Sequence, residues 1–129
     1  MPEEVTIRED LKVIQVTSHG VVTEEDFKAT LDAILRIREE QGLTKVFVDA
    51  TKVTSYPSTI SIYEFGSKAA AILKGIQVDI AVPPGIRETP VFFENVTRNR
   101  GAYISTFDSP EVALARLTQD AEQSHSGDA

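Results

Sequence analysis

The chain has 129 residues, of which 41% are hydrophobic, so its size and composition suit one domain with its own core. It contains no cysteine, which excludes disulfides, thiolate metal sites and thiol nucleophiles. The net charge of −7 opposes binding to nucleic acid, and neither a basic leader nor an apolar run of about 18 residues marks a secretory signal or a membrane span. We therefore expect a cytoplasmic protein.

The first elements predicted along the chain are two short strands and a helix. Apolar residues alternate imperfectly over residues 5–18, around an acidic turn, which predicts an antiparallel hairpin. Thr23 then begins an N-cap sequence in which Asp26 reaches back toward the cap. Gly42 supplies the left-handed residue that commonly ends such a helix.

Two buried strands and a second helix are predicted in the middle of the chain. Residues 46–48 and 77–82 are apolar runs too short for helices, so both are typical of strands covered on two faces. Residues 51–59 are polar and predict a loop. A helical pattern with a face of small residues begins near Ser58 and runs to Gly75.

The last third of the chain repeats one helix-start signal twice. Thr89 and Ser109 each precede a proline, an order that favours an N-cap followed by the first helical residue. The first of these helices is predicted to close at Gly101, and residues 102–107 predict another strand. Strands alternating with helices indicate an α/β domain with parallel neighbours.

Three stretches then carry a resemblance to a known family. They are Gly20 to Phe27, Val46 to Val53, and the short motifs Phe93-Glu94-Asn95-Val96, Asn99-Arg100-Gly101, Phe107-Asp108 and Ala113-Leu114. Together they resemble the STAS-like domains related to bacterial anti-sigma-factor antagonists such as SpoIIAA. The resemblance implies a central mixed sheet of about five strands with about four helices. We expect residues 1–118 to form this domain and residues 119–129 a disordered tail.

The family's phosphorylated serine marks a candidate switch site. In those antagonists it stands at the start of the helix after the central strand, within an Asp-Ser-Ser-Gly signature. The matching residues here are Pro57, Ser58, Thr59 and Ile60, so the hydroxyls remain while the flanking Asp and Gly are replaced. The resemblance implies a phospho-switch at Ser58 or Thr59. The same hydroxyls also suit a helix cap worth about 1 kcal/mol.

Further candidates surround this switch in sequence. Asp49 follows a buried strand, where open α/β sheets gather ligands, although its carboxylate would equally cap the loop. Tyr56 offers a flat anchor for an interface, and Tyr63 is either a second anchor or a core residue. The candidate docking surface consists of Asp49, Lys52, Tyr56, Ser58, Thr59 and Tyr63.

Charged and histidine side chains elsewhere offer little chemistry. Arg98 and Arg100 close the third helix, where cations suit the helix dipole, or else recognise an acidic group. The chain has only two histidines, His19 beside a predicted turn and His125 in the predicted tail, which argues against a histidine-based metal site or catalytic pair. We therefore predict no enzyme, no metal and no cofactor.

Two functions remain as hypotheses. The first is a non-enzymatic regulatory module that docks a partner protein or a second copy of itself; the exposed edge of the opening hairpin would suit a homodimer. The second is a carrier of a small apolar molecule or lipid, because STAS-like domains share their architecture with CRAL-TRIO lipid-exchange domains. In that case Phe65, Phe92 and Phe93 would line an apolar pocket.

Overall fold

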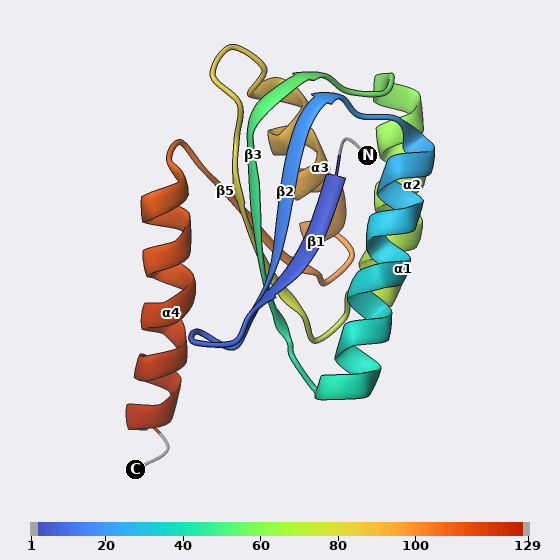
Figure 1. The fold of residues 1–129 in the computed structure, drawn as a ribbon. Coiled ribbons are helices and arrows are strands. Elements are labelled where there is room, and N and C mark those ends of the chain that lie inside the picture. Colours follow the sequence, from blue (N-terminus) through green and yellow to red (C-terminus); the bar gives the residue numbers. More distant parts are fainter. Residues whose placement is uncertain (1–2, 128–129) are drawn as a thin grey trace.

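The computed structural model describes the backbone of residues 3–127 and the side chains of residues 3–118. Its elements are β1 (Glu3–Arg8), β2 (Val13–Val21), α1 (Glu24–Gln41), β3 (Lys45–Ser55), α2 (Thr59–Ile72), β4 (Gln77–Ala81), α3 (Glu88–Arg98), β5 (Tyr103–Phe107) and α4 (Pro110–Gly127). The strands form one sheet in the order β1-β2-β3-β4-β5, antiparallel only between β1 and β2 (Figure 1). The predicted mixed α/β fold with five strands and four helices is confirmed.

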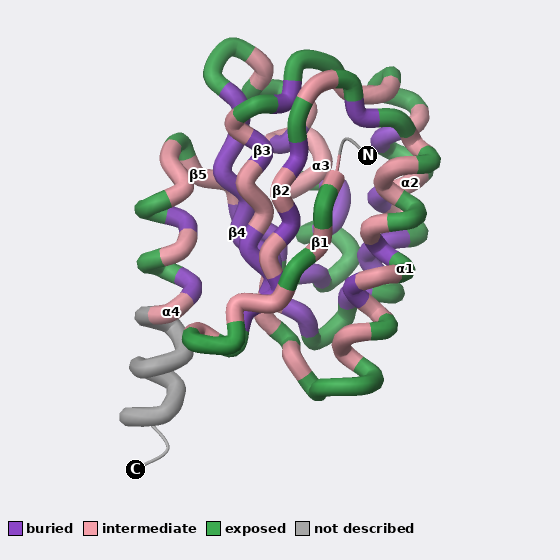
Figure 2. The backbone as a smooth tube through the Cα atoms, viewed as in Figure 1, coloured by how far each residue is buried: buried purple, intermediate pink, exposed green. Residues whose placement is uncertain are grey.

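Helices cover both faces of the sheet. Helices α1, α2 and α3 lie on one face, which we call the three-helix face, and α4 lies on the other (Figure 1). Alternate strand residues divide between the two layers: Val46 belongs to the core under the three helices, whereas Phe47 packs with Leu117 of α4. Figure 2 shows the central strands buried between these layers. This double burial explains why the middle strands are apolar runs.

The ends of α1 follow the predicted local chemistry. The hydroxyl of Thr23 accepts a hydrogen bond from the backbone N–H of Asp26 at 3.2 Å. The carboxylate of Asp26 accepts one from the backbone N–H of Thr23 at 2.7 Å, which completes a capping box. Gly42 ends the helix with a φ of 71°, a left-handed conformation that glycine adopts without strain.

Strand β3 is longer than predicted. It continues to Ser55, so most of the polar stretch expected as a loop over residues 51–59 is extended backbone. The reason is pairing with β2, which carries on past a register shift and places Lys52 beside His19 and Val53 beside Gly20. Val53 is buried, so this extension belongs to the core as well as to the sheet.

The helix starts in the last third of the chain differ in part from the prediction. Helix α3 is capped by Arg87 without a side-chain hydrogen bond, so Thr89 lies inside the first turn. The proline after it is tolerated there because the first N–H groups of a helix lack helical partners. At α4 the predicted cap is present: Ser109 Oγ accepts from the N–H of Val112 at 3.1 Å.

The backbone of α4 continues to Gly127, into the residues 119–129 that we expected to form a disordered tail. The side chains beyond residue 118 lie outside the described part of the chain, and the proposed division into a domain and a tail stays a prediction. No helix among the described residues is long and apolar enough to cross a membrane.

Candidate functional site: a cavity between the sheet and three helices

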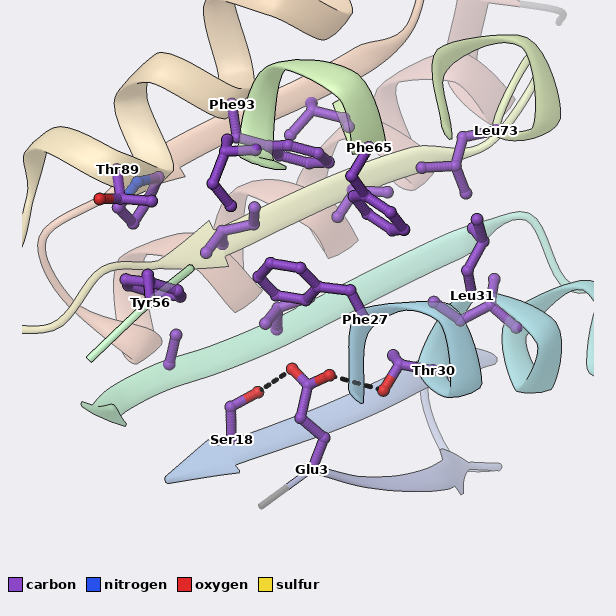
Figure 3. A pocket seen from close by; sticks show the side chains of 18 residues that line it. Glu3, Ser18, Phe27, Thr30, Leu31, Tyr56, Phe65, Leu73, Thr89 and Phe93 are labelled. Carbon is purple, nitrogen blue, oxygen red and sulfur yellow. Dashed lines mark hydrogen bonds between the residues drawn. The ribbon is translucent and has the colours of Figure 1, made fainter. Parts of the chain in front are cut away.

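A cavity of about 110 Å³ lies between the three-helix face of the sheet and helices α1, α2 and α3 (Figure 3). Most of its lining is apolar and includes Leu31, Val48, Phe65, Ile80, Phe93 and Ile104. An engineered apolar cavity of about 150 Å³ holds benzene, so this volume encloses on the order of five non-hydrogen atoms. Native cores seldom leave voids larger than one water molecule, so the cavity is more than a packing irregularity.

Four aromatic rings, Tyr56, Phe27, Phe65 and Phe93, form a row along one wall, which we call the aromatic row (Figure 3). Successive ring centroids are 6.3, 5.2 and 6.0 Å apart, and neighbouring planes differ by 25° or less. The rings come from the β3–α2 loop, α1, α2 and α3 in turn. Stacking at these distances ties the segments together and gives the cavity a wall of aromatic faces.

Helices α2 and α3 approach each other closely behind this wall. A Cβ atom added at Gly66 would lie 3.0 Å from Cγ1 of Val96 and 3.4 Å from Cδ1 of Phe93. The small-residue face predicted for the second helix therefore exists at Gly66, and it brings α3 near enough for Phe93 to join the row.

The carboxyl group of Glu3 forms the polar end of the cavity. Its Oε2 accepts a hydrogen bond from Ser18 Oγ at 2.6 Å, and its Oε1 accepts one from Thr30 Oγ1 at 2.7 Å (Figure 3). Strand alternation explains its position: Glu3, Val5 and Ile7 share one side of β1, and Val5 packs against the core under the three helices. Glu3 thus places an acidic side chain on the same side of β1 as these apolar residues.

Burial dominates the electrostatics at this end. Desolvation raises the pKa of Glu3 above its ordinary 4.5, the hydrogen bonds from Ser18 and Thr30 oppose the rise, and the nearby charge of Asp26 adds to it. Burial, followed by the charge of Glu3, raises the pKa of Tyr56 well above its usual range, so this phenol stays neutral. The charge of Glu3 therefore influences the ionisation of Tyr56 at the same end of the cavity.

The charged group among the described residues that line the cavity is acidic. Glu3 supplies a carboxyl group, whereas no lysine, arginine or histidine is among the described side chains that line the cavity. Over the same described residues, no three histidine, aspartate or glutamate side chains are placed to hold a metal ion.

The predicted docking residues do not form one site. Asp49 shares the side of β3 that carries Phe47, away from the cavity, and its Oδ1 accepts hydrogen bonds from the N–H and the hydroxyl of Thr51 at 3.1 and 2.6 Å. This is the local capping role that we considered for it. Lys52 is exposed on the same strand. Of the predicted set, Tyr56 lines the cavity.

Ser58, Thr59 and Tyr63 lie together on the outer surface at the start of α2. Ser58 is the N-cap and its Oγ accepts from the N–H of Ser61 at 3.2 Å, as predicted for a capping hydroxyl. Tyr63 is 48% exposed. The guanidinium of Arg100 lies 5.3 Å from the Tyr63 ring centroid and donates to its hydroxyl at 3.1 Å. The structure thus brings together a primary and a secondary candidate that the sequence treated separately.

The other arginine candidate holds the end of α3 against β5. Arg98 donates to the carbonyl of Ile104 at 3.2 Å and to Ser105 Oγ at 2.9 Å, and it lies 3.6 Å from the Glu94 carboxylate. These contacts occupy its guanidinium with the protein itself.

The predictions from the sequence did not include the polar end of the cavity, and they wrongly placed one aromatic residue in its lining. Glu3, Ser18 and Thr30 were not among the candidates, although the alternation of Glu3 with two apolar residues in β1 is a signal that could have found the acid. Phe65 and Phe93 line the cavity as the carrier hypothesis expected, but Phe92 is not among the lining residues.

No protein-family model and no curated protein matches the sequence. Solved structures, in contrast, do match the fold of the chain. The anti-sigma factor antagonist SpoIIAA in its unphosphorylated form aligns with a TM-score of 0.58 at 12% identity, covering 89% of this chain and 96% of that one. An uncharacterised protein of the DUF3478 family from Shewanella loihica PV-4, described as having a SpoIIAA-like fold, aligns at 0.54 and 16% identity, covering 89% and 91%. The chain therefore has the SpoIIAA-like fold that its sequence resembles.

Proposed function

We propose that this chain is a non-enzymatic STAS-like domain that binds a small, mostly apolar molecule in the cavity under α1, α2 and α3. The observation that carries the proposal is the cavity itself, with its aromatic row and a single, partly buried acid at one end. Ligand sites are typically concave and apolar with a few convergent polar groups. Of the two functions inferred from the sequence, the carrier hypothesis therefore gains the stronger support.

Access to the cavity supports the same proposal. All four rings of the aromatic row are only partly buried, so solvent reaches the wall that a ligand would touch. Fully enclosed cores bury aromatic side chains because their large apolar area stabilises the fold. Rings left partly exposed around a cavity offer that area to a ligand.

Native mass spectrometry of protein purified from its source cells tests the proposal. We expect a mass excess that corresponds to one bound small molecule and disappears on denaturation. Ala50 is buried and lines the cavity, so Ala50→Leu should fill the space and abolish the excess. Ala115→Leu makes the same change on the exposed side of α4 and should retain it. A bare chain mass for the wild type would count against ligand binding.

A second candidate function rests on the surface at the start of α2. Ile60 is 72% exposed and Tyr63 48% exposed, and both lie within the first turns after the Ser58 cap. We propose that this surface, the α2-start surface, docks a partner protein and that phosphorylation of Ser58 or Thr59 regulates it. A phosphoryl group there would add about two negative charges at a helix N-terminus.

Intact-mass measurement of the same native sample tests the switch. We expect a fraction of the chain to carry one phosphoryl group, and Ser58→Ala and Thr59→Ala variants made in the source cells to identify the residue. Wild-type protein without any phosphorylated fraction under growth and stress conditions would remove the switch, while leaving the cavity proposal standing.

Self-association is a further part of this second candidate. β1 is an edge strand of the sheet, so one side of its backbone is open to pairing with another strand. We expect a concentration-dependent dimer by sedimentation velocity that Thr6→Pro on this edge weakens. A monomer at every concentration would contradict this part.

A further inference from the structure

We propose that the cavity binds a small organic amine, whose ammonium group pairs with the carboxylate of Glu3 beside the rings of Tyr56 and Phe27. This inference rests on the proposed ligand binding and specifies the chemical class of the ligand. Three observations carry it: the charges around the cavity, the way Glu3 is held, and the position of the aromatic row.

The charges of the lining disfavour an acidic ligand. A fatty acid or a phosphate-bearing lipid would bring a negative head group into a cavity whose lining, within the described chain, has no cationic side chain. Glu3 would repel that head group, and an unpaired charge is costly to bury. A cationic or neutral head group meets no such penalty at Glu3.

Glu3 is held ready to accept a further hydrogen bond. An ionised carboxylate has about four acceptor sites, and the hydroxyls of Ser18 and Thr30 occupy one on each oxygen. The sites that remain suit an ammonium group, which donates and does not accept. Because the two hydroxyls come from β2 and α1, they fix the carboxyl from two sides before any ligand arrives.

The desolvation of Glu3 also favours a cation. Its carboxyl is already partly removed from bulk water in the free protein, where burial is the main influence on its pKa. That part of the desolvation free energy is already included in the free energy of folding, so ligand binding does not add it a second time. A bound ammonium group would supply the countercharge that the lining lacks.

The aromatic row supplies the second element of amine recognition. Figure 3 shows the Glu3 carboxyl pointing toward the cavity below the ring of Phe27, with Tyr56 at the same end. The centroids of these two rings are 6.3 Å apart. Aromatic faces attract ammonium groups through the ring quadrupole, and the attraction is stronger where water is excluded. The apolar part of the amine would then extend along Phe65 and Phe93.

Calorimetric titration with three probes of matched size tests the inference: phenethylamine, phenethyl alcohol and phenylacetate. Each is larger than the enclosed volume, so part of each probe would lie against the exposed parts of the aromatic row. At neutral pH we expect phenethylamine to bind at least about tenfold more tightly than the alcohol, because it adds charge-assisted and cation–π contacts. Phenylacetate should bind most weakly.

Two variants show whether Glu3 causes the preference. Glu3→Gln keeps the length and an acceptor oxygen, so it should abolish the advantage of the amine and retain binding of the alcohol. Glu4→Gln removes the same charge from the adjacent, exposed residue of β1 and should keep the advantage. Circular dichroism verifies that both variants are folded.

The outcomes separate the inference from the proposed function. If wild-type protein binds the alcohol or phenylacetate as tightly as the amine, the ligand class is wrong while ligand binding stands. An advantage of the amine that survives Glu3→Gln would also overturn the inference. If no probe binds and the native mass spectrum shows a bare chain, both are wrong.

Discussion

Thr30 on α1 donates a hydrogen bond of 2.7 Å to the carboxyl of Glu3, 27 positions earlier in the chain. This contact links the edge strand of the sheet to the helix that covers it, through a group that burial makes harder to ionise. The stability of the fold should therefore report on the charge of Glu3.

The contribution of Glu3 to the stability of the fold should fall as the pH rises past 4.5. The folded pKa of this carboxyl lies above its unfolded value of 4.5, so between the two values the folded state binds more protons. Raising the pH through that window then favours unfolding. Urea unfolding across the window checks this, with Glu3→Gln expected to show a smaller loss. Parallel curves for the two proteins would contradict the assignment.

Gly66→Ala should destabilise the protein by about 1 kcal/mol. Replacing a helical glycine with alanine normally stabilises by about 0.5–1 kcal/mol, whereas overpacking costs about 1–3 kcal/mol. The new Cβ would lie 3.0 Å from Cγ1 of Val96, a buried and stiff side chain, so the clash should prevail. The measurement is chemical unfolding in a double-mutant cycle with Val96→Ala, which should remove the clash. Additive losses would mean that the two positions do not interact.

Thr23→Ala should reduce the free energy of unfolding by about 1 kcal/mol, because it removes the hydroxyl that satisfies the N–H of Asp26 at the start of α1. Thermal unfolding monitored by circular dichroism measures the loss. Thr23→Ser keeps the hydroxyl and should stay close to the wild type. Equal losses in both variants would assign the effect to the methyl group.

Leu117→Ala should cost about 2–5 kcal/mol of stability, since this side chain is fully buried between α4 and the sheet. The cavity lies on the opposite face, so the affinity for phenethylamine should not change while the protein remains folded. Denaturant unfolding gives the first quantity and calorimetry below the transition gives the second. A lower affinity in the folded variant would show that the two faces are coupled.

Local chemistry made much of the fold predictable. The capping box at Thr23, the left-handed Gly42 and the cap at Ser109 depend on residues close together in sequence, so their elements begin or end as expected. The length of β3 depends on pairing with β2, and this pairing passes through a register shift that no local pattern reveals.

The candidate site was less predictable for a related reason. Its rings come from four separate segments, and its acid is held by hydroxyls of Ser18 and Thr30 that look unremarkable in sequence. Tyr56, Phe65 and Phe93 were singled out because aromatics suit anchors and pockets. Their assembly beside Glu3 depends on how the helices pack, including the close approach at Gly66.

Helix α2 separates the cavity from the outer surface of the molecule. Phe65 on its inner side stacks in the aromatic row, and Tyr63, two positions earlier, is exposed on the outer side with Arg100. A rigid helix cannot shift one side without the other. A molecule that moved α2 on entering the cavity would therefore also move the α2-start surface, on which we propose that a partner docks.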